Sequence, residues 1–191
     1  MSVPEGVVMS VPVEEPLRRV RMSWEEYLEL PERPRAEWVD GEVVINVAPV
    51  LFGHGDAVMR LGVRLVALFP DHYLVTEVGL WLPHNRLRAP DLMLVAEPPG
   101  ERWVREPPLL VVEVLSRSTR SEDTVRKSVD YARGGVGQYW VVDPEFRAID
   151  CFVLVDSEWQ LLARVDEEHP TAEVELEGVA VPLDLRQILR D

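Results

Sequence analysis

The sequence is poor in cysteine and has no long apolar run. Cys151 is the one cysteine among 191 residues, so the chain has neither an internal disulfide nor a zinc site built from several thiolates. No apolar segment reaches the ~18 residues that cross a membrane. Residues 1–21 lack the basic start and continuous apolar stretch of a signal peptide. We therefore expect a cytoplasmic protein that makes no membrane contact.

Positive charge is also scarce. The chain has 20 Lys and Arg residues against 34 Asp and Glu residues, which gives a net charge of −14. Such a surface repels a polyanion over most of its area, and this argues against a protein that coats DNA non-specifically. The net charge is compatible with an enzyme that contacts nucleic acid through one local cleft. It is also compatible with a metal site that offsets part of the negative charge.

Lysine is nearly absent, because Lys127 is the one lysine among the 20 basic residues. A general bias towards arginine explains the count, but Lys127 also marks a place that needs a compact ammonium of adjustable pKa. On a helical wheel Lys127 lies away from the apolar stripe of Val125, Val129 and Ala132. The simple prediction is a solvated side chain, and a catalytic role requires that this face border a cleft.

What the chain does contain is typical of a globular protein, with 47% apolar and 28% charged residues. The patterns predict helices over residues 23–30, 56–69, 121–133 and 184–189. They predict strands over residues 37–47 (a hairpin turning at 40–41), 73–77, 79–82, 91–95, 109–115, 138–143, 149–155 and 159–165. Residues 109–115, a nearly continuous apolar run, form the candidate central strand. This order predicts an α/β sheet covered by helices. We expect an N-terminal arm over 1–22, packed on a surface such as a partner subunit, and one domain over 23–191.

Two acidic residues stand on predicted central strands. Glu113 shares a strand face with Val111 and Leu115, and a buried carboxylate must take up a proton, pair with a cation or bind a metal. Asp91 follows a proline and is by itself typical of a turn. As a pair, the two carboxylates suit Mg²⁺, which takes one or two carboxylates with water and substrate phosphate. For Glu113 the alternatives to a metal ligand are a structural salt bridge to an arginine and a strand end that reaches solvent.

Glu37 and His54 are further candidates. Glu37 precedes the turn at 40–41. The alternative to a role in the site is that Glu37 is a solvated charge on the hairpin. His54 lies at a predicted helix start, where it is able to contact phosphate or a metal-bound water, or simply to cap the helix. Asp56 is predicted as the N-cap of that helix.

Taken in order, these residues resemble the Uma-two family of the PD-(D/E)XK nuclease superfamily, over residues 23–165. The resemblance is carried by 24–28 (WEEYL), 37–42 (EWVDGE), 90–92 (PDL), 107–116 (PPLLVVEVLS) and 135–144 (GVGQYWVVDP), with His54, Ser118, Thr119, Asp123, Lys127 and Tyr131. It implies a restriction-endonuclease-like core, with a central mixed β-sheet flanked by helices and with extra β-hairpins.

The resemblance also implies an activity, namely a metal-dependent endonuclease that hydrolyses phosphodiester bonds in nucleic acid, DNA rather than RNA. Asp91 and Glu113 would hold Mg²⁺ or Mn²⁺. The superfamily pattern places a lysine two residues after the acid, where this chain has Leu115. Lys127 on the following helix matches the variant in which that lysine has moved. Glu37 and His54 match positions that complete the site. Gln138 stands where family members often carry Glu.

Arginines flank the acidic motifs in sequence and are candidates for a basic rim that contacts nucleic acid. They are Arg86, Arg88, Arg117 and Arg120, and ordinary surface arginines are the alternative. Because cutting two strands takes two sites, we expect a homodimer.

Two other interpretations stay open. The first is a catalytically silent nuclease fold that serves binding or regulation, which the net charge favours. The second is a buried ion-pair network of the acidic residues with Lys127, which would ignore divalent ions. Intact Asp91, Glu113 and Lys127 favour the enzyme.

Overall fold

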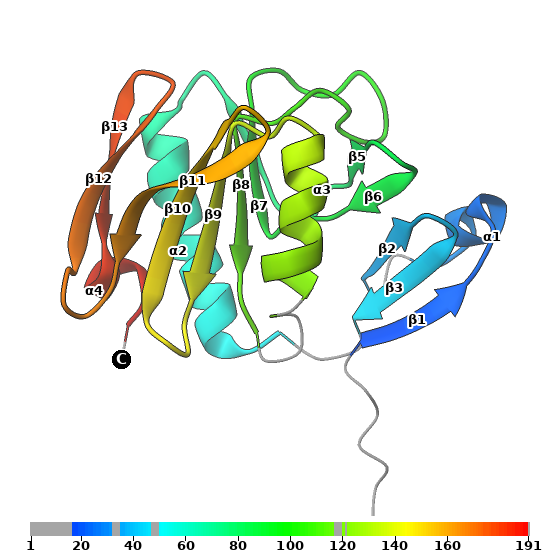
Figure 1. Cartoon of the computed structure of the whole chain (residues 1–191), viewed down its shortest axis with the longest axis horizontal. Helices are drawn as coiled ribbons and strands as arrows, with labels where there is room; N and C mark the ends of the chain where they lie inside the picture. Colours follow the sequence, from blue (N-terminus) through cyan, green and yellow to red (C-terminus); the bar gives the residue numbers. More distant parts are fainter. Residues whose placement is uncertain (1–16, 32–34, 47–49, 117–119, 121, 191) are drawn as a thin grey trace, which may run out of the picture.

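The computed structural model describes residues 17–190, apart from 32–34, 47–49, 117–119 and 121. Its centre is a six-stranded sheet with a helix on each face, and smaller sheets lie at both ends (Figure 1). The strand order is β11-β10-β9-β8-β7-β4. The strands are β4 (Tyr73–Val75), β7 (Leu92–Val95), β8 (Leu110–Val114), β9 (Gln138–Asp143), β10 (Ala148–Val155) and β11 (Glu158–Val165).

The apolar run at 109–115 supplies the central strand, as the sequence predicts. All five residues of β8 are buried, because β8 is paired on both sides and covered on both faces. It runs parallel to β9 and antiparallel to β7, which makes the sheet mixed. The predicted α/β fold with a mixed central sheet is therefore confirmed.

Helix α2 (Phe52–Leu68) covers one face of this sheet, and its Leu61 and Leu65 are fully buried there. It starts four residues before the predicted start. Leu51 is its N-cap and makes no side-chain capping bond, so the expectation for Asp56 is wrong. Asp56 instead forms ion pairs with Arg60 and Arg190.

The other face is covered by a π-helical turn, η1 (Glu122–Lys127), that continues into α3 (Ser128–Arg133). The predicted helix at 121–133 is thus present, with a wider first half than expected. It ends at Gly134, and Gly135 follows with a positive φ of 73°.

A five-stranded sheet lies beside this helix, in the order β1-β3-β2-β6-β5. Its strands are β1 (Leu17–Arg21), β3 (Glu42–Asn46), β2 (Ala36–Val39), β6 (Arg86–Arg88) and β5 (Leu80–Leu82). The predicted hairpin turn is confirmed: Asp40 and Gly41 have φ of 49° and 83°, as a tight two-residue connection requires. Helix α1 (Trp24–Leu28) carries the predicted capping box between Ser23 and Glu26.

The sequence did not predict β6, nor the hairpin of β12 (Thr171–Leu176) and β13 (Val179–Asp184), which precedes α4 (Leu185–Ile188). β6 is short and carries two arginines, which gives it no strand signal. β12 does alternate polar and apolar residues, so a strand signal was present there and was missed. Strand β1 lies within the expected arm and pairs with β3 of its own chain; residues 1–16 lie outside the described residues. Among the described helices, none has the length and hydropathy that a bilayer crossing requires.

Candidate active site

The structure brings together the two carboxylates that the sequence singled out. β7 and β8 are antiparallel, with Leu92 opposite Val112, so Asp91 stands opposite Glu113 one position further on. Residues that face each other in this way project to the same side of the sheet. Both side chains are buried, and the Val114 amide donates a hydrogen bond to Asp91 Oδ2 at 2.8 Å. This side of the sheet faces η1 and α3.

Lys127 connects Glu113 with Glu37. Its Nζ lies 3.0 Å from Glu113 Oε1 and 3.1 Å from Glu37 Oε1. The Tyr131 hydroxyl, one helical turn further on, donates to the same Glu113 oxygen at 2.5 Å. Because Tyr131 is buried against this carboxylate, its own pKa lies well above the usual range. Two helix residues thus hold Glu113 in place.

The wheel-based prediction of a solvated Lys127 is wrong. Lys127 is only 5% exposed, whereas Val125 and Val129 of the apolar stripe are 62% and 44% exposed. A π-helical turn has more residues per turn than the α-helix that the wheel assumes. In addition, the ion pairs of Lys127 with Glu113 and Glu37 stabilise a buried position of this helix face. The spacing of apolar residues in a sequence carries no information about such ion pairs.

Glu37 is held by two cations and one backbone amide. Besides Lys127, Arg88 Nη1 contacts its Oε2 at 3.0 Å, and the Ala89 amide donates to its Oε1 at 3.0 Å. Burial alone would raise the pKa of Glu37, but the charges of Lys127 and Arg88 outweigh it and lower the pKa to about 2. Glu37 is therefore ionised at neutral pH.

Arg88 is fully buried and forms two hydrogen bonds to Asp130 Oδ2, at 2.9 and 2.7 Å. It joins β6 to α3 from inside the protein and does not stand on an exposed rim, so the rim prediction is wrong for this residue. Arg86 is partly exposed and contacts Asp130 Oδ1 at 3.1 Å.

Asp91 has its own cationic neighbours. Arg35 Nη1 lies 3.0 Å from Asp91 Oδ1, and His54 Nε2 lies 3.6 Å from the same oxygen. Although burial acts in the opposite direction, the contact with His54 and the charge of Arg35 keep the pKa of Asp91 well below its usual range. Burial also opposes a raised pKa of His54, but the contact with the charged Asp91 carboxylate outweighs burial and raises it. Arg35 Nη2 is buried and finds no hydrogen-bond partner within the described part of the chain.

The rim prediction also named Arg120 and Arg117. Arg120 forms ion pairs with Asp143, the last residue of β9, and with Glu145 in the turn that follows. Arg117 lies outside the described residues, as do Ser118, Thr119 and the side chain of Asp123.

Sequence reasoning missed Arg35 and Asp130, and it gave Tyr131 no role. For two of these the signal was present. Arg35 precedes Glu37 by two residues and so projects to the same side of the extended chain. Tyr131 follows Lys127 by four residues and so shares its helix face. Asp130 gave no such signal, because its partners come from β6.

The cluster balances its charges and offers oxygen ligands. Four acidic residues (Glu37, Asp91, Glu113 and Asp130) face four basic ones (Arg35, Arg86, Arg88 and Lys127). No group of three or more His, Cys, Asp or Glu side chains is arranged as a metal site within the described ranges. A Mg²⁺ ion with several waters needs only one or two carboxylates, however, and Asp91 and Glu113 supply hard oxygen donors. The residues present therefore fit such an ion.

A mixed sheet between two helices, with Glu113 on β8 and Asp91 directly before β7, defines a restriction-endonuclease-like α/β protein. Residues 24–185 match the model of the Uma2 family, described as "Putative restriction endonuclease", and the chain belongs to that family. Its fold is similar to that of a solved structure, a "putative nuclease belonging to DUF820 from Anabaena variabilis ATCC 29413". The TM-score is 0.69 at 17% identity, over 86% of this chain and 95% of the other. That likeness establishes the fold alone. No curated protein matches the chain.

Proposed function

We propose that the protein is a Mg²⁺- or Mn²⁺-dependent endonuclease that hydrolyses phosphodiester bonds in nucleic acid, with DNA as the first candidate. Membership of a restriction endonuclease family supports a nuclease. One observation supports these residues as its centre: the Lys127 ammonium lies 3.0 Å from Glu113, in a buried cluster that has Asp91 opposite Glu113. This is an acid pair with an adjacent lysine, supplied from a helix.

In this proposal Asp91 and Glu113 hold the metal ion through carboxylate oxygens. A bound divalent ion supplies a Lewis acid for the scissile phosphate and lowers the pKa of a coordinated water. The Lys127 ammonium donates a hydrogen bond to the attacking water or to a phosphate oxygen, where negative charge develops. Tyr131 and Glu37 are positioning residues, because they fix Glu113 and Lys127 by the contacts described above. His54, beside Asp91, contacts phosphate.

A catalytically silent module is the second candidate, and the balanced charges of the cluster favour it. Every acidic side chain there already has a cationic neighbour, so the network satisfies itself without a metal. Arg35 already contacts Asp91 Oδ1 at 3.0 Å. In the enzyme, Arg35 would therefore share Asp91 with the ion or move away from it.

Thermal stability in the presence of Mn²⁺ tests the metal site that the endonuclease requires. A ligand that binds only the folded state stabilises it by about 2.7 kcal/mol at a hundred times its Kd. We expect millimolar Mn²⁺ to raise the Tm of the wild type and to leave the Tm of Glu113→Gln unchanged. Glu101→Gln is the matched control, because Glu101 is exposed and pairs with Arg105 on the surface. An equal response in wild type and Glu113→Gln would place the ion elsewhere.

A cleavage screen then tests the activity itself. Supercoiled, linear and single-stranded DNA and RNA are incubated with Mg²⁺ or Mn²⁺, and the products are separated on gels. We expect wild-type cleavage of at least one substrate and none by Asp91→Asn or Glu113→Gln. A folded, Mn²⁺-binding wild type that cuts none of them supports the silent module.

A cytoplasmic location and a homodimer complete the proposal. The single, buried cysteine suits a reducing compartment. Two sites in one dimer would allow both strands of a duplex to be cut.

A further inference from the structure

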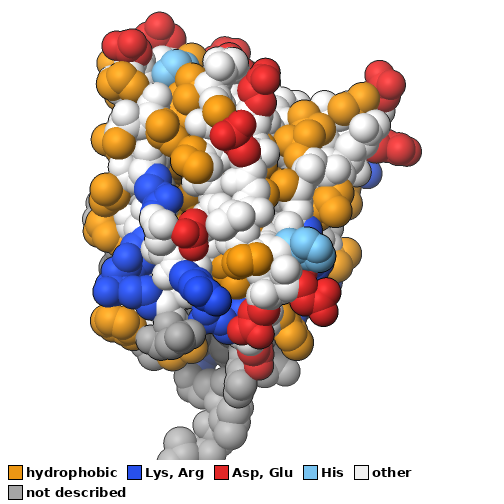
Figure 2. Space-filling model, turned by 90° about the vertical axis from the view of Figure 1, so that its left-hand side faces the viewer, with side chains coloured by type: hydrophobic (Ala, Val, Ile, Leu, Met, Phe, Trp, Pro, Cys, Tyr) orange, Lys and Arg blue, Asp and Glu red, His pale blue; other side chains and the backbone are white. Residues whose placement is uncertain are grey.

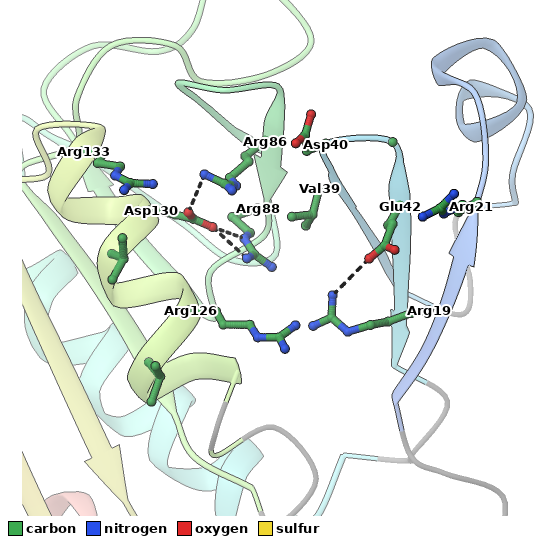
Figure 3. Close-up of a pocket in the computed structure, with 13 residues that line it drawn as sticks. Arg19, Arg21, Val39, Asp40, Glu42, Arg86, Arg88, Arg126, Asp130 and Arg133 are labelled. Carbon is green, nitrogen blue, oxygen red and sulfur yellow. Dashed lines mark hydrogen bonds and ion pairs between the residues drawn. The ribbon is translucent and has the colours of Figure 1, made fainter.

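A cleft of about 780 Å³ lies between the five-stranded sheet and the helix formed by η1 and α3. Figure 3 shows arginines entering it from both walls. The sheet contributes Arg19 and Arg21 from β1 and Arg86 from β6, and the helix contributes Arg126 and Arg133.

Backbone periodicity explains why these side chains meet. In β1, Arg19 and Arg21 pair in register with Val44 and Glu42 of β3, so they project to one face of the sheet. Val20 projects to the other face, towards the side where Trp38 and Val43 pack. On the helix, Val125, Val129 and Arg133 follow at four-residue intervals and share one face.

The cleft is basic in a protein that is otherwise strongly acidic. Six arginines and three acidic side chains line it, an excess of three positive charges, whereas the whole chain carries −14. Arg21 and Arg133 have no ion-pair partner within the part of the chain that the structure describes. Arg86 Nε is buried and has no hydrogen-bond partner there. The guanidinium groups of Arg21 and Arg133 are therefore available to an anion, whereas Arg86 is already paired with Asp130.

The cleft adjoins the candidate active site. Arg88 and Asp130 line it and also belong to the buried network, in which Arg88 contacts Glu37 and Glu37 contacts Lys127. Exposed Val125 and Val129 supply an apolar strip between the arginines. A ligand with repeated negative charges and apolar groups between them matches this lining.

We infer that this cleft binds the phosphodiester backbone of the nucleic acid that the site cuts, an inference that rests on the proposed function. Arg19, Arg21, Arg126 and Arg133 contact phosphate oxygens, for which the planar guanidinium group is well suited. Val125 and Val129 contact sugars or bases. An acidic protein thereby gains a single local surface that attracts a polyanion and leads it towards Glu113 and Lys127.

Binding measured without cleavage tests the inference. Fluorescence anisotropy is recorded with single- and double-stranded DNA and RNA oligonucleotides in EDTA, over a series of salt concentrations. The variant is Arg21→Glu with Arg133→Glu. The matched control is Arg164→Glu with Arg190→Glu, which makes the same charge change at exposed arginines on the surface, outside the cleft lining. Thermal unfolding confirms that both variants are folded.

We expect the cleft variant to bind its best probe about tenfold more weakly or worse, and the control to bind as the wild type does. Removing one arginine that contacts phosphate should flatten the plot of log affinity against log salt by about 0.9 for duplex or about 0.7 for a single strand. Arg21→Ala and Arg133→Ala therefore each serve as a finer test. The probe that binds most tightly identifies the nucleic acid class.

The failures are distinguishable. If the wild type binds a probe and the cleft variant binds it equally well, or if the wild type binds none at low salt, the inference about the cleft is overturned. If binding depends on the cleft but no metal ion yields cleavage, the inference stands and the endonuclease proposal fails.

Discussion

At the scale of single residues, Lys127 combines a high desolvation cost with two close acidic neighbours. A buried ammonium is tolerated only where acidic partners surround it. Glu113 and Glu37 provide them at 3.0 and 3.1 Å. Neighbouring carboxylates repel each other when no cation lies between them, but in the structure each of these is paired with a cation. Removal of Lys127 or of one of the two carboxylates should therefore destabilise the folded protein.

Lys127→Met leaves two buried carboxylates without their shared ammonium. We expect the free energy of unfolding to fall by about 3–5 kcal/mol, the usual result of breaking a buried ion pair from one side. Urea unfolding followed by circular dichroism measures it. Arg164→Met is the control: its exposed pair with Asp150 should contribute less than about 1 kcal/mol. Equal stability of Lys127→Met and wild type would mean that the lysine contacts are not maintained in solution.

Glu37 predicts a pH dependence of stability. Its pKa of about 2 in the folded protein lies below the value of about 4.3 for an unfolded chain. A lowered carboxyl pKa stabilises the folded state at pH above the unfolded value, and this stabilisation disappears as the pH falls through the folded value. The stability difference between wild type and Glu37→Gln should therefore be constant from pH 7 to about 5 and shrink from there towards pH 2. Denaturant unfolding at several pH values tests this; a difference that does not change with pH would contradict the ion pairing.

At the scale of elements, the backbone at Gly137, directly before β9, lies very close to the backbone that leads into β8. Gly137 precedes β9, its amide donates to the Pro108 carbonyl, and a Cβ added there would lie 2.8 Å from the Leu109 carbonyl oxygen. The obstructing atom is backbone beside the central strand, so it has little freedom to move. The conformation at this position therefore accepts only a residue without a side chain.

Gly137→Ala should lower the free energy of unfolding by about 1–3 kcal/mol through overpacking. Gly100→Ala is the control, because a Cβ at Gly100 would have no atom within 4 Å. Thermal or urea unfolding of the two variants gives the comparison. If both variants match the wild type, the packing of residue 137 against β8 is looser than the structure shows.

At the scale of the whole molecule, charge is distributed unevenly. The end formed by β12, β13 and α4 mixes acidic, basic and apolar side chains, with basic ones gathered in its lower part (Figure 2). Several arginines at this end have partners, such as Arg60 with Asp56 and Arg64 with Gln187. The cleft at the opposite end differs because its arginines outnumber its acids. The distribution of charge over the surface, rather than the net charge, decides whether an acidic protein is able to bind nucleic acid.

The homodimer remains a prediction at this scale. Multi-angle light scattering should give twice the chain mass of 21.8 kDa at micromolar concentration. A constant mass of one chain over the accessible concentrations, with nucleic acid absent and present, would rule it out.

The sequence by itself determined the central strand, the capping box of α1, the hairpin turn at Asp40 and Gly41, and the family. Each structural feature among these depends on local chemistry: an apolar run, a side-chain cap, or positive φ at two residues. The sequence also selected Asp91, Glu113, Glu37 and Lys127 as candidates. Contacts between distant segments were beyond it, because alternation and helical period describe a face but do not say what lies against it.

Only the tertiary structure decided which faces meet. It buried Lys127 between Glu113 and Glu37 instead of leaving it in water, and it moved Arg88 from an expected rim into the interior. It also placed β1 beside β3 and opposite α3, which created the basic cleft. The physical reason for the position of Lys127 and of Arg88 is the same. A buried charge is stable only beside a partner of opposite charge, and that partner comes from a distant segment of the chain.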